Sequence, residues 1–368
     1  MRVLVCIGTR PEAVKMAPVI HELKLQKIDF SICVTAQHRE MLDQVLDFFD
    51  IVPDFDLDLM EPGQSLNSVS SRILWEMDKL LEKENPEMVL VQGDTTTAFI
   101  ASLAAFNREI RIGHIEAGLR TSNLKAPFPE EANRQLISRI ADLHFVPTEK
   151  AKKNLMAESI PMDQIFLTGN TVVDALIIGR ERLWGGYKNK DIEELEGIHV
   201  ENKKLILVTG HRRENLGKGL EEVCTALSTI AKREDVQIIF PVHLNPSVNE
   251  KVFTFLDSIP NIRLISPLSY PAFLWLMMKA TLIITDSGGV QEEAPTFGKP
   301  VIVFREKTER PEGVEAGFSY LTGTSQAKIV SHASRLLDRP PNFSGMENPF
   351  GDGRASRRIV QFLLLKNA

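Results

Sequence analysis

Three acidic side chains in the first half of the sequence have the types and positions that proton transfer needs. Asp94 and Glu116 each stand at the end of an apolar run, and Glu130 stands at the start of a predicted helix. Carboxylates that lie close together raise each other's pKa, which suits general acid–base catalysis near neutral pH. The pattern also permits plainer roles: a helix cap for Asp94, a structural acid for Glu116 and a helix-dipole partner for Glu130.

Glycine turns that precede predicted helices offer anion sites in both halves of the sequence. Residues 8–12 (Gly-Thr-Arg-Pro-Glu) follow the first apolar run, with Lys15 one turn later, and residues 287–289 (Ser-Gly-Gly) follow a later run. Free backbone N–H groups, a hydroxyl and nearby cations can together bind phosphate. The spacing is not that of a dinucleotide-binding or Walker motif, and no zinc-ligand pattern is present.

Basic and histidine side chains follow the apolar runs of the second half. His211 stands beside Arg212 and Arg213, and His243 follows the next run. Glu293 lies one helical turn after residues 287–289, where a carboxylate could bind a ribose diol. Anion-binding turns in both halves, acids in the first half, and histidine with arginine in the second indicate a negatively charged nucleotide ligand with acid–base chemistry at one end.

The elements that must position these residues alternate along the whole chain. Continuously apolar runs rich in Val, Ile and Leu are typical of parallel strands buried on both faces. They occur at 3–7, 30–35, 88–93, 111–116, 143–147, 165–168, 205–209, 236–242, 262–266, 282–285 and 301–304. Amphipathic stretches lie between them, such as 11–26, where Pro11 suits a first helical turn.

Length and composition predict an α/β protein of two domains. The 368 residues carry 43 basic and 49 acidic side chains, a formal net charge of −6, which argues against a nucleic-acid partner. Three cysteines are too few for a disulfide framework, so a reducing cytoplasm is expected. No apolar run is long enough to span a membrane.

Because the strand pattern restarts near Leu205, we predict two Rossmann-like, doubly wound parallel-sheet domains, residues 1–169 and 170–354, facing a cleft. In such sheets ligands bind beyond the carboxyl ends of the strands. The pattern alone leaves open where the last helix, about 355–368, packs, and we place it back on the first domain.

These motifs together resemble those of the bacterial non-hydrolysing UDP-N-acetylglucosamine 2-epimerases, which have a glycosyltransferase-B-like fold. The matching blocks extend over nearly the whole chain: Gly8–Glu12, Thr35–His38, Gly93–Thr97, His114–Thr121, Pro129–Arg134, Thr168–Asp174, Thr209–Asn215, Asp286–Pro295 and Thr308–Glu312. The resemblance implies reversible conversion of UDP-GlcNAc to UDP-ManNAc for cell-surface polysaccharide synthesis. UDP would be eliminated to give a bound 2-acetamidoglucal and then added back.

The resemblance also implies roles for particular residues. The implied catalytic group is Asp94, Glu116, Glu130 and His211, with His211 stabilising the departing diphosphate. The implied substrate-binding residues are Arg10, Lys15, Phe273, Ser287, Gly288, Gly289, Glu293 and Arg310. In this scheme Glu293 binds the ribose and Phe273 packs on the uracil. The family needs no cofactor or metal, and its members imply a cytoplasmic homodimer.

Some bacterial members bind a second UDP-GlcNAc at an allosteric site. The residues that match its neighbourhood are Gln37, His38, Gln64, Arg213 and His243. Glu40 stands where those members often have Gln, and Gly63 where they often have Arg. An added acid and a lost cation both weaken diphosphate binding, which argues against allosteric activation in this chain.

Three alternative functions remain open from the sequence. A hydrolysing epimerase would release ManNAc and UDP, although the intact block of residues 114–121 argues against it. A retaining glycosyltransferase on the same fold would need an acceptor site. A non-catalytic sensor would bind the nucleotide sugar without exchanging its C2 proton.

Overall fold

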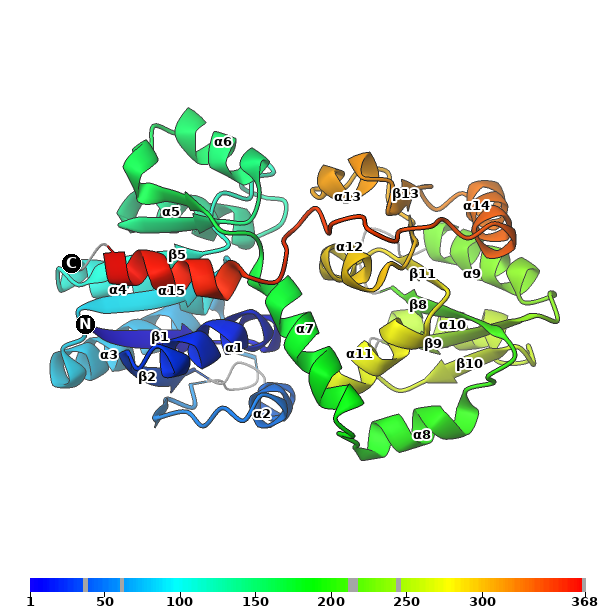
Figure 1. Ribbon diagram of the computed structural model, residues 1–368, viewed down its shortest axis with the longest axis horizontal. Coiled ribbons are helices and arrows are strands. Elements are labelled where there is room, and N and C mark those ends of the chain that lie inside the picture. Colours follow the sequence, from blue (N-terminus) through cyan, green and yellow to red (C-terminus); the bar gives the residue numbers. More distant parts are fainter. Residues whose placement is uncertain (36–38, 60–62, 211–217, 243–245, 366–368) are drawn as a thin grey trace. The chain divides into compact units, whose positions relative to one another are not determined.

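The computed structural model describes residues 1–35, 39–59, 63–210, 218–242 and 246–365. The chain divides into two compact units (Figure 1). Unit 1 comprises Met1–Ile178 and Phe350–Ala368, and unit 2 comprises Gly179–Pro349. The sequence predicted boundaries at 169/170 and 354/355, whereas the compact units divide at 178/179 and 349/350.

Unit 1 contains a parallel sheet of seven strands in the order β3-β2-β1-β4-β5-β6-β7. Its strands are β1 (Arg2–Ile7), β2 (Asp29–Val34), β3 (Phe55–Asp56), β4 (Met88–Gln92), β5 (Arg111–Ile115), β6 (Leu143–Val146) and β7 (Ile165–Leu167). Every residue of β4 is buried, as expected for a central strand covered by helices on both faces.

The helices of unit 1 cover this sheet (Figure 1). They are α1 (Arg10–Leu25), α2 (Arg39–Phe48), α3 (Leu66–Glu84), α4 (Thr96–Asn107), α5 (Glu130–Ile140), α6 (Glu149–Ala157), the 3-10 turn η1 (Met162–Gln164), the first part of α7 (Thr171–Trp184) and α15 (Ala355–Leu365). The Thr95 hydroxyl caps α4 by accepting from the Ala98 N–H at 3.0 Å. The last helix, α15, packs against α1 (Figure 1).

Unit 2 contains a second parallel sheet, of six strands in the order β10-β9-β8-β11-β12-β13. Its strands are β8 (Lys204–Thr209), β9 (Val236–Pro241), β10 (Ile262–Ile265), β11 (Leu282–Thr285), β12 (Val301–Val303) and β13 (Ser319–Leu321). Its helices are the end of α7, α8 (Lys190–Ile198), α9 (Lys218–Ile230), α10 (Pro246–Leu256), α11 (Tyr270–Lys279), α12 (Gly288–Glu293), α13 (Pro311–Glu315), α14 (Gln326–Asp338) and the 3-10 turn η3 (Ala294–Phe297).

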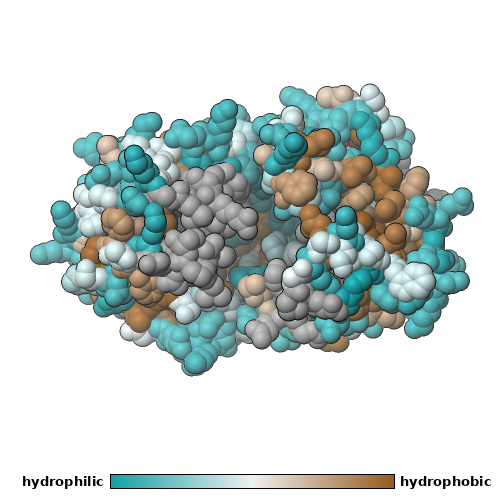
Figure 2. Space-filling model, turned by 180° about the vertical axis from the view of Figure 1, so that it is seen from behind, coloured by the Kyte–Doolittle hydropathy of each residue, from teal (hydrophilic) through white to brown (hydrophobic). Residues whose placement is uncertain are grey.

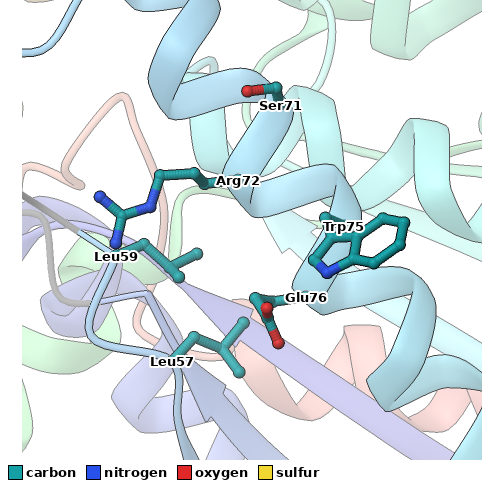
Figure 3. A pocket seen from close by; sticks show the side chains of 6 residues that line it. All are labelled: Leu57, Leu59, Ser71, Arg72, Trp75 and Glu76. Carbon is teal, nitrogen blue, oxygen red and sulfur yellow. The ribbon is translucent and has the colours of Figure 1, made fainter.

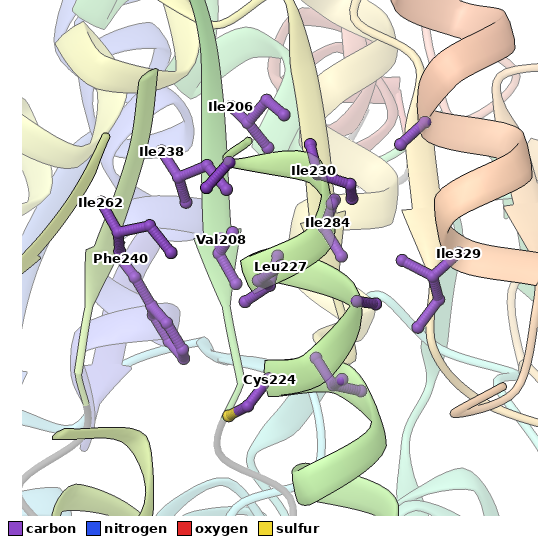
Figure 4. Close-up of a cluster of buried hydrophobic side chains, with 14 of the residues drawn as sticks. Ile206, Val208, Cys224, Leu227, Ile230, Ile238, Phe240, Ile262, Ile284 and Ile329 are labelled. Carbon is purple, nitrogen blue, oxygen red and sulfur yellow. The ribbon is translucent and has the colours of Figure 1, made fainter. Parts of the chain in front are cut away.

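The core of unit 2 forms where α9 packs on its sheet (Figure 4). Leu227 and Ile230 of α9 belong to the same buried cluster as Val208 of β8, Ile238 of β9 and Ile284 of β11. Burying one such aliphatic side chain contributes roughly 1.5–3 kcal/mol. This packing fixes the strand ends on which the site residues of unit 2 stand.

In each sheet the strand order reverses at one point, between β1 and β4 in unit 1 and between β8 and β11 in unit 2. Open α/β sheets bind their ligands at such a point, beyond the carboxyl ends of the strands. The predicted α/β class with two parallel sheets is confirmed. The sequence missed β3 (Phe-Asp) and β13 (Ser-Tyr-Leu) because neither is part of a continuous apolar run, the signal that revealed the equally short β7 and β12.

The face of the molecule in Figure 2 shows patches of apolar side chains among polar ones. Trp75 and Phe106, on α3 and α4, are among the most exposed large apolar side chains of unit 1. Among the described residues, no helix combines the length and the hydrophobicity needed to cross a membrane.

Candidate active site

Glu116 stands directly after β5 and is held by side chains from three other elements. Its side chain is 6% exposed, and its backbone has a positive φ of 63°. Lys15 on α1 donates from Nζ to Oε1 at 2.5 Å, and the Asn170 amide donates to the same oxygen at 2.9 Å. Gln92, the last residue of β4, donates to Oε2. These donors favour the ionised carboxylate and fix its direction.

Asp94 follows β4 and is held by two side chains of α5. Arg134 donates from Nε and Nη2 to Asp94 Oδ2, the Nε contact being 3.1 Å, and Asn133 donates to the Asp94 backbone carbonyl at 2.9 Å. Asp94 does not cap α4, because Thr95 does. The Asp94 side chain remains 26% exposed, so it can reach a ligand.

The sequence suggested that Asp94 and Glu116 repel each other, but a cation beside each carboxylate offsets this repulsion. Lys15 pairs with Glu116 and Arg134 pairs with Asp94, so each acid has its own positive partner. Lys15, which the resemblance placed beside phosphates, therefore lies in contact with an acid. Two carboxylates at the ends of neighbouring strands thus each have a counter-charge.

Glu130 and Glu131 occupy the first turn of α5 and differ sharply in their surroundings. Glu131 is fully buried and accepts from the backbone N–H groups of Thr121 and Ser122 at 3.0 and 3.1 Å and from Arg134 Nη1 at 3.0 Å. Burial alone would raise the pKa of Glu131, but these donors and the Arg134 charge hold it below its ordinary value. Glu131 thus stabilises the loop before α5 through these hydrogen bonds.

Glu130 carries a buried oxygen, Oε2, that has no hydrogen-bond partner within the described structure. A carboxylate oxygen without a protein donor is available to a ligand or to a proton. Of the two acids in this turn, Glu130 is therefore the one suited to chemistry.

Glu12 joins the turn after β1 to the turn after β4. It is buried, accepts from the Gly8 N–H at 3.1 Å, and accepts from the Thr95 hydroxyl at 2.8 Å. Burial raises the pKa of Glu12 to about 7, although these hydrogen bonds oppose the rise. A side chain on Gly8 would place Cβ 2.3 Å from Thr97 Oγ1, so only glycine allows this close approach. Arg10 begins α1 directly after this turn.

Two neutral histidines lie beside the acids, in register on adjacent strands. His114 on β5 pairs with His144 on β6. The His114 ring contacts the Gly93 carbonyl oxygen through Nε2 at 2.7 Å. Burial lowers the pKa of His114 to about 4 and that of His144 to about 3.

We expect these histidines to make the protein less stable as the pH falls from 6.5 to 4. In that range the unfolded histidines bind protons and the folded ones do not, so unfolding is favoured. Each histidine lowers the free energy of unfolding by about 1.4 kcal/mol per pH unit. Glu12 acts in the opposite direction, because a raised folded pKa gives stability that is lost as the pH rises through about 7.

Denaturant unfolding of the wild type and of His144→Leu at several pH values isolates one histidine from the other titrating groups. The difference between the two proteins is expected to be constant above pH 7.5 and to shift in favour of the variant below pH 6. Parallel curves from pH 4 to 8 would contradict the assignment of a neutral buried His144.

In unit 2 the turn between β11 and α12 is fixed by hydroxyl groups. The Ser287 N–H donates to Thr285 Oγ1 at 2.9 Å, and that hydroxyl also contacts Thr209 Oγ1 of β8 at 2.6 Å. Gly288 and Gly289 begin α12 at this point. The turn therefore stands at the reversal point of the second sheet.

The guanidinium group of Arg310 lies against Gly288 in this turn. A Cβ on Gly288 would lie 2.9 Å from Arg310 Cζ, so the glycine makes room for the guanidinium group. Arg310 donates from Nε to the buried Glu292 at 2.8 Å, and its Nη1 pairs with Glu309 at 2.9 Å. Two carboxylates thus hold the guanidinium group in place.

The remaining predicted residues of unit 2 lie on nearby helices. Phe273 lies on α11, partly buried against the core, and Glu293 ends α12 with a partly exposed side chain. His211, Arg213 and His243 lie outside the described residues, as do Gln37 and His38 of unit 1. The structure therefore does not bear on those five.

A groove of about 470 Å³ lies on the β3 side of unit 1 (Figure 3). It is lined by Leu57 and Leu59 after β3 and by Ser71, Arg72, Trp75 and Glu76 of α3. Gln64, which precedes α3, donates to the Leu59 carbonyl at 3.2 Å. None of the predicted catalytic or substrate-binding residues lines this groove.

Sequence reasoning did not assign a site role to Gln92, Asn170 or Glu12. Gln92 and Asn170 hold Glu116, and Glu12 joins two strand-end turns. One signal was visible: Gln92 is the polar end of an otherwise apolar strand. Asn170 gave no such signal, because its distance in sequence from Glu116 hides the contact.

The chain is similar along its whole length to characterised proteins. The family model described as UDP-N-acetylglucosamine 2-epimerase matches residues 21–364. The UDP-N-acetylglucosamine 2-epimerase of Salmonella typhimurium is 52% identical, with 99% of this chain and 98% of the relative covered. That of Escherichia coli is 50% identical with the same coverage.

Solved structures agree with this similarity. The UDP-GlcNAc 2-epimerase of Neisseria meningitidis bound to UDP-GlcNAc superposes with a TM-score of 0.92 at 48% identity, covering 99% of this chain and 100% of the other. The Methanocaldococcus jannaschii enzyme in complex with UDP-GlcNAc and UDP gives 0.84 at 34% identity, with the same coverage. A glycosyltransferase of kitacinnamycin, 13% identical, gives 0.64, which shows the shared fold alone.

Proposed function

Because the chain belongs to the UDP-N-acetylglucosamine 2-epimerase family, we propose that it interconverts UDP-GlcNAc and UDP-ManNAc without releasing the sugar. The family makes the chain an isomerase. The observation that carries the proposal is similarity over 99% of the chain to a structure bound to UDP-GlcNAc. In this proposal the reaction uses residues that follow strands of both units, such as Asp94 and Glu116 in unit 1 and Ser287 in unit 2, together with residues of nearby helices.

The proposed reaction avoids a free carbanion at C2, whose hydrogen is weakly acidic without a neighbouring carbonyl. A carboxylate takes the C2 proton, the electron pair of the C2–H bond forms the C1=C2 double bond, and the electron pair of the breaking C1–O bond leaves with the β-phosphate of UDP. The products are UDP and 2-acetamidoglucal, which stay bound. Addition of the UDP oxygen to C1 and of a proton to the other face of C2 completes the epimerisation.

The acids of unit 1 supply the proton transfers in this scheme. Arg134 and Lys15 fix the side chains of Asp94 and Glu116, and in this scheme each carboxylate accepts or returns a proton. Glu130 has an oxygen that no donor of the described residues contacts, and in this scheme it takes or returns a proton on a ligand. Which acid serves which face of C2 is a question for single variants.

The turn after β11 supplies the diphosphate contacts in this scheme. Arg310, held by Glu292 and Glu309, would pair with phosphate oxygens beside Ser287 and the two glycines that follow. Arg10, Phe273, Glu293 and His211 keep the roles that the resemblance implies: phosphate, uracil, ribose and the leaving diphosphate.

Proton NMR of UDP-GlcNAc with the purified protein in D₂O tests the proposed function. We expect UDP-ManNAc to form and deuterium to enter C2 of the sugar, with UDP still attached. Release of free ManNAc would favour the hydrolysing reaction. Absence of deuterium at C2 with UDP-GlcNAc alone would contradict the proposal and favour a transferase or a sensor.

We expect Arg310→Ala to weaken UDP binding by about 10- to 100-fold. Loss of a charge-assisted hydrogen bond costs about 1.5–3 kcal/mol, and phosphate recognition uses several such bonds. Calorimetric titration with UDP measures the change. Arg310→Lys, which keeps the charge but loses the forked geometry, should lie between the wild type and Arg310→Ala. An unchanged dissociation constant in Arg310→Ala would remove Arg310 from the binding site.

Three properties implied by the resemblance stay predictions: a homodimer, a cytoplasmic location and a role in polysaccharide synthesis. Allosteric activation by UDP-GlcNAc also stays open, because most of the residues concerned lie outside the described ones.

A further inference from the structure

We propose that Asn170 is a positioning residue for Glu116, and that it ties this carboxylate to the segment where the chain returns to unit 1. The proposal rests on the proposed function, because it concerns how Glu116 is held for proton transfer. It assigns to Asn170 a role in the rate of the chemical step rather than in substrate binding.

The side chain of Asn170 connects Glu116 to the start of α7. It is 3% exposed, donates from Nδ2 to Glu116 Oε1 at 2.9 Å, and accepts from the Val172 N–H through Oδ1 at 3.0 Å. The backbone N–H of Val172 can only donate, so it fixes which amide atom is the oxygen. The NH₂ group must therefore face Glu116.

The backbone of Asn170 is held by the returning chain. Its N–H donates to the Phe350 carbonyl at 2.7 Å. A Cβ on Gly169 would lie 3.3 Å from Gly351 Cα, and one on Gly351 would lie 3.3 Å from Asn170 N. Such contacts are tighter than side chains normally accept, so both glycines let the two segments approach.

We call the residues 169–174 and 350–356 the junction. Asp174 of α7 accepts from the N–H groups of Ala355 and Ser356 and from the Ser356 hydroxyl, at 3.2, 2.9 and 2.6 Å. The start of α7 and the start of α15 are thus hydrogen-bonded into one piece. The chain leaves unit 1 along α7 and re-enters it at Phe350, so both passages between units adjoin the junction.

Asn170 connects the junction to the Glu116 carboxylate. Among the described residues, the charged and titratable groups that face Glu116 from the packed elements include Lys15 on α1 and the neutral His114 on β5, which lies within the field of the Glu116 charge. Lys15 supplies charge, whereas Asn170 supplies a neutral donor of fixed direction. Loss of that donor lets the carboxylate turn and leaves its ionised form less stabilised.

Two variants separate the donor from the packing. Asn170→Asp keeps the volume and the acceptor for Val172 but replaces the donor with a second carboxylate, whereas Asn170→Ala removes the side chain. A hydrogen bond to a charged group is worth a factor of about 10–100 in rate. We expect kcat to fall by that factor in both variants, with KM for UDP-GlcNAc unchanged.

The pH profile supplies a readout that a merely structural role would not move. Two neighbouring carboxylates hold a proton to higher pH, so the acid limb of kcat in Asn170→Asp is expected to shift upward. The matched control is Ser356→Ala, which loosens the junction without touching Glu116. The control should have a lower melting temperature but the wild-type kcat and pH profile.

The proposal is overturned if the Asn170 variants follow Ser356→Ala in kcat and pH profile. If the wild type does not convert UDP-GlcNAc, the proposed function is contradicted instead. In that case ¹³C NMR titration of the Glu116 carboxyl, identified by its loss in Glu116→Gln, still decides the positioning role. A higher Glu116 pKa in Asn170→Ala supports the role, and an unchanged one overturns it.

Discussion

Asp94→Asn is expected to lower kcat by about 10²–10⁴-fold, the range that a positioned acid–base group contributes. Asparagine keeps an oxygen for the Arg134 guanidinium and nearly the same volume, so the fold should survive. It cannot accept the C2 proton. Rates of epimerisation and of deuterium entry at C2 should therefore fall, while the melting temperature changes little.

A control acid of the same type stands on α3. Asp78 is exposed and pairs with Arg108, so Asp78→Asn should turn over normally. If Asp94→Asn loses epimerisation but still exchanges the C2 proton, Asp94 acts on one face of the sugar only. Normal turnover in Asp94→Asn would remove Asp94 from the catalytic group.

Arg134→Met is expected to destabilise unit 1 by about 3–5 kcal/mol, because it leaves a buried charge without its partner. Glu131 is fully buried, and Asp94 loses the same guanidinium group. The corresponding fall in melting temperature is about 10 °C for a unit of this size. Turnover should fall as well, since Asp94 is no longer held.

Calorimetric melting temperatures of Arg134→Met and Arg108→Met test this prediction, because each variant loses an arginine that pairs with two acids. Arg108 pairs with Asp78 and Glu82 in solvent, where ion pairs contribute little, so its variant should melt close to the wild type. Equal melting temperatures for the two variants would show that the Glu131 pair does not support the fold.

The sequence predicted the sheets and the place of the acids because both follow local patterns. Buried parallel strands are continuously apolar, and the residues after them must lie at one edge. Asp94 and Glu116 could therefore be found without the structure. Strands β3 and β13 could not be found, since neither is part of a continuous apolar run.

The partners of these acids could not be predicted from the sequence. Glu116 is contacted by Lys15 of α1 and by Asn170, the residue before α7. Asp94 is contacted by Arg134 of α5. Such contacts depend on how helices pack on the sheet, which no local spacing encodes. The sequence therefore suggested like-charge repulsion where the fold supplies cations.

The place of α15 has a consequence for how the polypeptide assembles. Helix α15 packs on α1, and Asp174 binds the first turn of α15. Unit 1 is therefore completed by residues that are synthesised after the whole of unit 2. On the ribosome, the whole of unit 2 emerges before α15 is made, so the face of α1 against which α15 packs stays uncovered until then. A circular permutant that begins with α15 would remove that delay.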